Sequence, residues 1–223
     1  MNHPDRIKEP LGWFVGLFRE HPAESFIGVE IAGDEPRIVV PLWDQLLGEL
    51  MPSRPVWGIG TSDTHILTRV RFGFTVLLLD DLTNEKAKTA LRSGRFYSVV
   101  GPKILNLSRT RGDTHDGAPA YVGTYPTLRS IVVDRDTGRI SIDASGYDEI
   151  VWVSKPASSA PASDANGTAS WPAGQIVQRG PVFDFSRGDP TLPYVRAELI
   201  RHTDAGPVRL FTNPFGLRRP VAE

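Results

Sequence analysis

The sequence predicts an α/β segment followed by an all-β antiparallel sandwich. Segments with helical and strand-like hydrophobic patterns alternate up to about residue 101, which is typical of β/α units around a parallel sheet. Beyond that point only short strand-like segments follow, separated by turns, as in antiparallel sandwiches. We therefore expect two parts, residues 1–101 and residues 102–223.

Three segments of the first part are predicted to be helices, at residues 10–20, 41–51 and 83–93. Pro41 suits the first helical position of the second segment, and Pro52 ends it. The third segment has Thr83 as a candidate N-cap and Gly94 as a glycine just past its end.

Strands are expected between these helices, at residues 26–31, 56–61, 72–79 and 96–100. The segment 72–79 is apolar almost throughout, which is typical of a strand covered on both faces. Together with the helices, these strands favour a parallel sheet.

The second part is predicted to consist of short strands at residues 103–109, 129–133, 139–143, 149–153, 175–185, 194–201 and 208–212. The tripeptide Asp136-Thr137-Gly138 predicts a hairpin turn between two of them. Residues 155–174 are rich in alanine, serine and proline and predict a mobile loop within the sandwich.

Composition argues against several classes of protein. The formal net charge of −1 does not favour a nucleic-acid binder, whose affinity depends on a basic surface. The absence of cysteine excludes disulfides, cysteine-ligated zinc, iron–sulfur clusters and thiol catalysis. No apolar run approaches the ~20 residues that span a bilayer, and no signal-peptide pattern occurs. We expect neither a nucleic acid nor a membrane as a partner, and a cytoplasmic location by default.

Candidate metal ligands are limited to five histidines and to carboxylates. The most informative segment is Trp57-Gly-Ile-Gly-Thr-Ser-Asp63-Thr-His65, a glycine-containing strand that leads into Asp-x-His. In an extended chain, residues i and i+2 project to the same side about 6.5–7 Å apart. Asp63 and His65 can therefore ligate one metal ion or two adjacent ones. The alternative is a turn in which Asp63 accepts from local backbone amides and His65 is exposed.

The remaining histidines differ in what they indicate. His3 precedes a proline, which restricts it to extended geometry and makes it a second candidate ligand. His21 is interpreted as a charge at a helix end, His115 as part of a turn, and His202 as a surface residue.

Candidate substrate contacts are few. Arg92 and Arg95 either clamp an anionic substrate or are charges at a helix end. Trp152 and Trp171 offer aromatic surfaces for a carbohydrate-binding sandwich if they are exposed. No dinucleotide, nucleoside-triphosphate or α/β-hydrolase motif occurs.

Several segments together resemble the C-terminal part of PHP (polymerase and histidinol phosphatase) domains. They are Asn2-His3-Pro4, Ile27-Gly-Val-Glu30-Ile31, Trp57-Gly-Ile-Gly-Thr-Ser-Asp63-Thr-His65, Leu82-Thr83 and Ala90-Leu-Arg-Ser-Gly-Arg-Phe-Tyr97. The branch they resemble is the CehA/McbA-like metal-dependent hydrolases, in which a β-sandwich follows the barrel. Tyr194-Val-Arg-Ala-Glu198 and Thr212-Asn213-Pro214 are similar to the last strands of that sandwich.

The resemblance implies the C-terminal part of a distorted β/α barrel with divalent metal ions at the strand ends. It implies that His3, Asp63 and His65 are metal ligands. Neutral imidazole and carboxylate suit zinc, manganese or iron as the ion. Of the two arginines, Arg95 is kept as a weak candidate for substrate binding. The implied reaction is hydrolysis of a small phosphoester or related ester by a metal-activated water.

The family's N-terminal His-x-His ligands have no counterpart in this sequence. We therefore expect a fragment of a longer protein that holds its metal weakly and has little turnover. The alternative is an inactive, truncated chain whose β-sandwich is a binding or interaction module.

Overall fold

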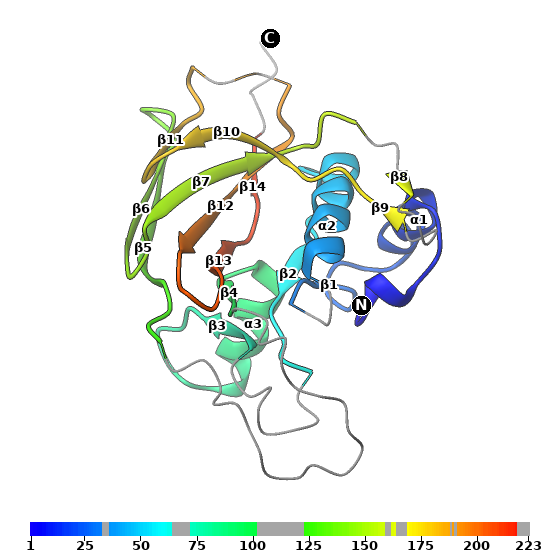
Figure 1. The fold of residues 1–223 in the computed structure, drawn as a ribbon, viewed down its shortest axis with the longest axis horizontal. Helices are drawn as coiled ribbons and strands as arrows, with labels where there is room; N and C mark the ends of the chain where they lie inside the picture. The colour runs from blue at the N-terminus through cyan, green and yellow to red at the C-terminus, as the bar shows by residue number, and fades with distance from the viewer. Residues whose placement is uncertain are drawn as a thin grey trace.

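A computed structural model describes residues 1–32, 36–63, 72–101, 123–158, 162–163, 169–187, 189 and 191–217. The helices are η1 (Pro4–Arg6, a 3₁₀ helix), α1 (Leu11–Glu20), α2 (Pro36–Leu50) and α3 (Asn84–Ser93). The strands are β1 (Gly28–Glu30), β2 (Trp57–Ile59), β3 (Gly73–Leu77), β4 (Phe96–Val100), β5 (Thr127–Asp134), β6 (Arg139–Ser145), β7 (Glu149–Ser154), β8 (Ala162–Ser163), β9 (Ala169–Ser170), β10 (Gln175–Arg179), β11 (Val182–Asp184), β12 (Tyr194–Arg201), β13 (Val208–Thr212) and β14 (Phe215–Gly216). Most of the described elements are therefore strands (Figure 1).

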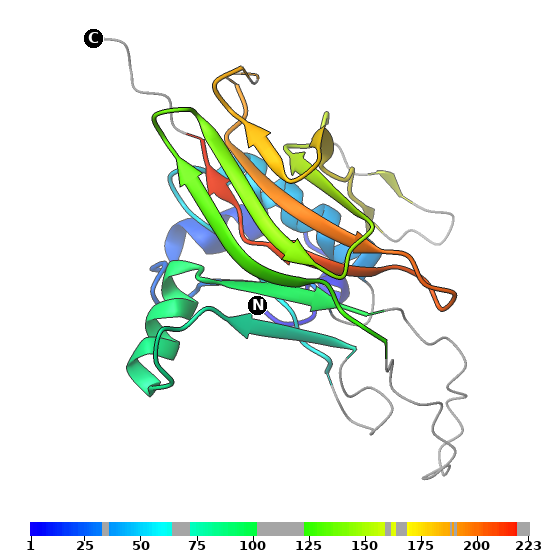
Figure 2. The same ribbon diagram turned by 90° about the vertical axis from the view of Figure 1, so that its left-hand side faces the viewer.

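The largest sheet is antiparallel. Its strand order is β10-β7-β12-β13-β4-β3, and β14 also pairs with β12. A smaller sheet, in the order β11-β6-β5, lies against one of its faces (Figure 2). Alternate residues of β12, such as Ala197 and Leu199, join Ile140 and Trp152 in the apolar core between the two sheets. The intervening residues of β12 project to the opposite face, as the two-residue period of a strand requires.

A small parallel unit covers part of that opposite face. β1 and β2 pair in parallel, with Gly28 opposite Trp57, and α2 connects them in the sequence. The apolar stripe of α2 includes Trp43, which is fully buried and donates its indole N–H to the Val56 carbonyl at 2.8 Å. A second core forms around this tryptophan, with contributions from α1 and β1.

The described residues do not form the expected C-terminal part of a β/α barrel, so the predicted fold class is wrong. Among the described strands only β1 and β2 pair in parallel. β3 pairs antiparallel with β4, and β4 continues the sheet through β13. Strands from before and after residue 101 therefore lie in one sheet.

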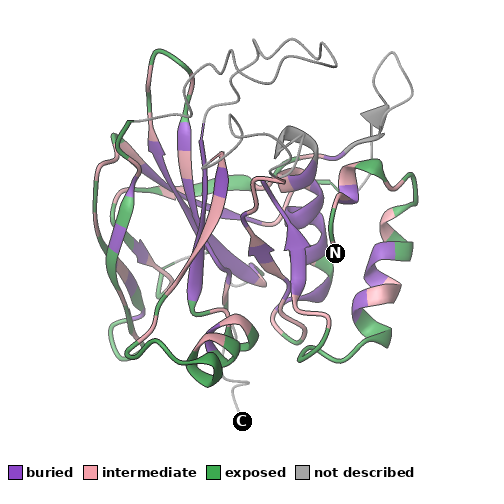
Figure 3. Cartoon of the chain, turned by 90° about the horizontal axis from the view of Figure 1, so that it is seen from below, coloured by how far each residue is buried: buried purple, intermediate pink, exposed green. Residues whose placement is uncertain are grey.

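The composition of α3 explains why the alternation of helices and strands did not correspond to a parallel sheet. A strand-helix-strand order occurs in a parallel crossover and also in an antiparallel pair whose connection contains a helix. A crossover helix must cover the sheet with an apolar stripe. In α3 only Ala90 is buried, and the helix is largely exposed (Figure 3). Because α3 does not cover the sheet, β4 can return directly beside β3.

Three local expectations also need correction. α2 begins at Pro36, so Pro41 lies inside the helix rather than at its first position. The segment 175–185 forms two strands in different sheets, divided at Gly180, whose φ of 98° is accessible mainly to glycine. Among the described strands β3 lies at the edge of its sheet, and its residues after Gly73 are only partly buried.

The predicted ends of α3 are confirmed. The Thr83 hydroxyl accepts from the Lys86 amide at 3.3 Å, and Gly94 has a left-handed φ of 70°. Side-chain capping and a C′ glycine are local signals, which is why the sequence identified them.

Parts of the segment 155–174 are attached to α2. Gln45 donates its amide to the Ser158 carbonyl at 2.8 Å and to the Pro172 carbonyl at 3.0 Å, and Trp171 is buried. Residues 159–161 and 164–168 of this segment, and the predicted strand at 103–109, lie outside the described residues. No helix in the described part of the chain has the length and apolar character needed to cross a membrane.

Candidate metal site

Three parallel chain segments end at one edge of the small parallel sheet. Met1 pairs with β1, because its amino group donates to the Gly28 carbonyl and the Glu30 amide donates to the Met1 carbonyl, each at 2.9 Å. β2 lies on the other side of β1 in the same direction. Glu30 ends β1, His3 follows the Met1 segment, and Asp63 follows β2. Carboxyl ends of parallel strands commonly carry functional side chains.

His3 does not have the extended backbone that its place before Pro4 predicts. Its φ of 47° and ψ of 51° are left-handed, a conformation that costs a non-glycine residue about 1–3 kcal/mol. Two hydrogen bonds hold it there. The His3 N–H donates to Glu30 Oε2 at 2.7 Å, and the His3 carbonyl accepts from the Arg6 amide at 3.0 Å. The first bond joins residues that are far apart in the sequence, and the second belongs to the η1 turn. The backbone preference of a residue before proline could therefore predict neither of them.

Glu30 is a site residue for which the sequence predicted no role. Its side chain is 4% exposed, although it ends an apolar strand. Besides the His3 N–H, its carboxylate accepts the hydroxyl of Thr61. A single carboxylate within the apolar Ile27-Gly-Val-Glu30-Ile31 segment was the available signal, since a buried acid requires partners.

The structure brings His3 and Asp63 together. His3 Nε2 lies 3.8 Å from Asp63 Oδ1, and both side chains are partly exposed. Asp63 also has a left-handed φ, of 44°. Strained backbone at two neighbouring residues is typical of functional sites. His65, the third predicted ligand, lies outside the described residues.

The donors at this edge are of a kind that suits a divalent metal. Imidazole nitrogen and carboxylate oxygen are ligands for zinc, manganese and iron. The Nδ1 atom of His3 is buried and has no hydrogen-bond partner. Among the described residues, however, no group of three or more histidine and acidic side chains is arranged to hold a metal ion. At this edge the described residues therefore bring together one imidazole, His3, and two carboxylates, Glu30 and Asp63.

Side chains of the antiparallel sheet hold β2 in place. The Gly60 amide donates to Ser98 Oγ at 2.7 Å, and Ser98 Oγ donates to the Gly58 carbonyl at 2.8 Å. The Asn213 side-chain oxygen accepts from the Gly58 amide at 3.0 Å. A Cβ on Gly58 would lie 2.7 Å from the Trp43 ring. The close approach that glycine permits thus fixes the strand that leads to Asp63.

Arg95, the weaker candidate for substrate binding, is not brought to His3 and Asp63. It is exposed at the end of α3. Gly94, its neighbour, packs on Trp57, which donates its indole N–H to the Arg92 carbonyl at 3.1 Å. Trp57 begins β2, whereas Asp63 follows the opposite end of that strand.

The other histidines and the two tryptophans singled out in the sequence are not assigned to this edge. His21 follows α1 and His202 follows β12, and both are exposed. His115 is outside the described residues. Trp152 and Trp171 are both buried, so they do not provide the exposed aromatic surface that a carbohydrate-binding sandwich needs.

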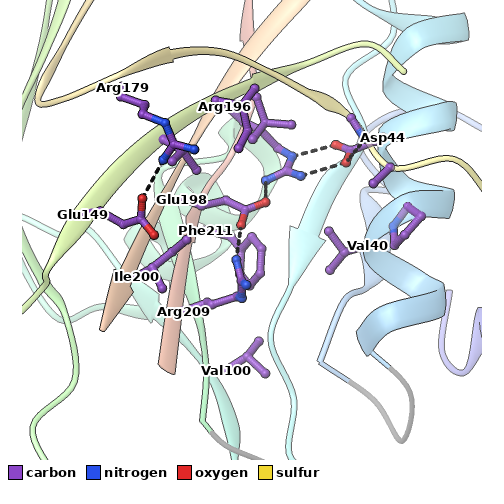
Figure 4. Close-up of a pocket in the computed structure, with 16 residues that line it drawn as sticks. Val40, Asp44, Val100, Glu149, Arg179, Arg196, Glu198, Ile200, Arg209 and Phe211 are labelled. Carbon is purple, nitrogen blue, oxygen red and sulfur yellow. Dashed lines mark hydrogen bonds and ion pairs between the residues drawn. The ribbon is translucent and has the colours of Figure 1, made fainter. Parts of the chain in front are cut away.

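A buried charge cluster lies between α2 and the large sheet (Figure 4). Arg196 is fully buried and pairs with Asp44 through two hydrogen bonds of 2.7 and 2.8 Å. A third bond of 2.7 Å joins Arg196 to Glu198, which also accepts from Arg209 at 2.8 Å. Burial by itself lowers the pKa of Arg196, but Asp44 and Glu198 outweigh it and raise the pKa above its ordinary value. The guanidinium therefore stays charged.

A cavity of about 480 Å³ opens beside this cluster, between α2 and the sheet. Its walls include Val40 from α2 and Val151, Ile200 and Phe211 from the sheet. Its volume lies within the range of about 300–1,000 Å³ that is typical of small-molecule pockets.

Comparisons of the chain with protein-family models, with curated proteins and with solved structures found no match.

Proposed function

We propose that the edge formed by His3 and Asp63, together with His65, contributes to a metal-dependent hydrolytic site for small phosphoesters or related esters. The observation that carries the proposal is the 3.8 Å approach of His3 Nε2 to Asp63 Oδ1, across some 60 residues of sequence. The local resemblance to PHP hydrolases supports it, since both residues match ligand motifs of that family. The proposal does not depend on a barrel.

Each residue has a distinct task in this proposal. Asp63 supplies negative charge and oxygen donors, and His3 supplies a neutral nitrogen donor on a backbone held by Glu30. His65 adds a second imidazole in the Asp-x-His arrangement. A bound zinc, manganese or iron ion would supply Lewis acidity and lower the pKa of its water ligand.

Metal binding tests the assignment of Asp63. We expect Asp63→Asn to weaken Mn²⁺ or Zn²⁺ binding at least about 10- to 100-fold, because even outer-shell changes cost that much. Asp204→Asn, at an exposed turn, is the matched control and should bind as the wild type does. Isothermal titration calorimetry measures the three affinities. Equal binding by Asp63→Asn, or no binding by the wild type, contradicts the proposal.

Hydrolysis of bis-p-nitrophenyl phosphate tests the reaction class. We expect turnover to be small, because the family's His-x-His ligands have no counterpart in this sequence. The turnover should require the added metal and should disappear in Asp63→Asn. Turnover that survives this substitution would show that Asp63 is not part of the reacting site.

Small-molecule binding by the antiparallel sheets is the second candidate function. The cavity beside Arg196 favours it, because an apolar wall there meets the charged side chains of Glu198 and Arg209. A chain that folds but binds no divalent metal in the titration would favour this alternative.

A further inference from the structure

Glu30 joins the two chain segments that carry His3 and Asp63. One of its carboxylate oxygens, Oε2, accepts the His3 N–H at 2.7 Å, and the other accepts the Thr61 hydroxyl. Thr61 lies two residues before Asp63 in the same loop. Because Glu30 itself ends β1 and is buried, it connects both segments to the sheet.

The imidazole of His3 lies between two carboxylates. Nδ1 is 3.6 Å from Glu30 Oε2, and Nε2 is 3.8 Å from Asp63 Oδ1. A neutral imidazole has one N–H, and an ionised carboxylate can only accept. The Nδ1 atom is buried without a hydrogen-bond partner, and a proton on it would face the acidic side chain of Glu30.

We propose that Glu30 is a positioning residue that holds the His3 proton on Nδ1 and leaves the lone pair of Nε2 free beside Asp63. Histidines that ligate metals commonly donate their other ring N–H to a carboxylate, which fixes the tautomer and the orientation of the ring. The relevance to a metal rests on the proposed function. The tautomer itself is a property of the metal-free chain.

The tautomer can be read directly from ¹⁵N–¹H correlation spectra of the histidine side chains. The metal-free protein is measured at about pH 8, where an ordinary imidazole is neutral, and a His3→Ala spectrum identifies the His3 signals. We expect the Nδ1–H tautomer in the wild type. Glu30→Gln should shift the population toward Nε2–H, since the charged acceptor is lost.

Metal affinity provides the second measurement. Glu30→Gln should weaken Zn²⁺ binding about 10- to 100-fold, the usual effect of removing an outer-shell partner. Thr61→Val is the matched control, because it removes the other bond to Glu30 and retains the carboxylate beside His3. It should leave the tautomer unchanged.

The possible results separate the two proposals. An Nε2–H tautomer in the wild type overturns the role of Glu30, and so does a Glu30→Gln protein that keeps both the wild-type tautomer and the wild-type affinity. If Glu30→Gln does not fold, the wild-type spectrum alone decides. A wild type with the Nδ1–H tautomer that binds no metal supports the positioning role and contradicts the hydrolase proposal.

Discussion

Replacing Arg196 with methionine should lower the free energy of unfolding by about 3–5 kcal/mol. Removing one partner of a buried ion pair leaves the other charge without compensation. Here Asp44 and Glu198 both lose their contacts with a fully buried guanidinium, and Glu198 retains its ion pair with Arg209. The guanidinium also lies 4.9 Å from the centre of the Trp43 ring, so the cation–π contact disappears as well. Urea denaturation measures the loss.

The exposed pair of Arg179 and Glu149 is the control for this substitution. Arg179 is 64% exposed, so Arg179→Met should cost no more than about 1 kcal/mol, as is usual for surface ion pairs. Similar losses of unfolding free energy in Arg196→Met and Arg179→Met would contradict the conclusion that the buried cluster stabilises the fold more than a surface ion pair does.

The loss of unfolding free energy caused by Arg196→Met should also depend on pH. Burial raises the pKa of Asp44, and Arg196 opposes that increase. Without Arg196 the pKa of Asp44 in the folded state rises further above its unfolded value. A carboxyl group shifted in this direction destabilises the fold at high pH, and the penalty fades as the pH falls. The difference in unfolding free energy between this variant and the wild type should therefore narrow as the pH falls toward about 4, the ordinary pKa of an aspartate in an unfolded chain.

The second large effect is expected for Trp43→Ala, at about 3–5 kcal/mol of unfolding free energy. The substitution leaves a cavity between α2 and the parallel strands, because the Trp43 side chain is fully buried and its ring lies over Gly58. It also leaves the Val56 carbonyl without the indole N–H. Thermal and urea unfolding both report this loss.

Trp13 provides the comparison within the same chain. It lies on α1 and is 40% exposed, so Trp13→Ala should be distinctly less destabilising than Trp43→Ala. A larger loss of unfolding free energy for Trp13→Ala than for Trp43→Ala would mean that the core around α2 is not the main support of the β1–α2–β2 unit.

The sequence could predict elements whose signals are local. Thr83 and Gly94 define the ends of α3 by their own chemistry, and the apolar residues of α2 recur at helical spacing. Strand partners are set by contacts far along the chain. The pairing of β3 with β4 and of β4 with β13 could not be obtained from periodicity. The polar composition of α3 was an available signal against a parallel crossover.

In the candidate site, too, local patterns could be predicted from the sequence, whereas contacts between distant segments could not. The Asp-x-His pattern drew attention to Asp63, and the structure places His3 beside it. The left-handed backbone of His3 depends on Glu30, 27 residues away, so the local rule for residues before proline predicted the wrong conformation. Asp44 and Arg196 lie 152 positions apart, and neither segment alone indicates their pairing.

The most direct test of the proposed metal site is a crystal structure of the chain grown with Zn²⁺ or Mn²⁺, with anomalous difference maps recorded at the absorption edge of the metal. We expect a peak at the edge formed by His3 and Asp63, within about 2.0–2.2 Å of His3 Nε2 and of an Asp63 carboxylate oxygen when zinc is bound. No anomalous peak at this edge, or a metal bound by neither residue, would contradict the account.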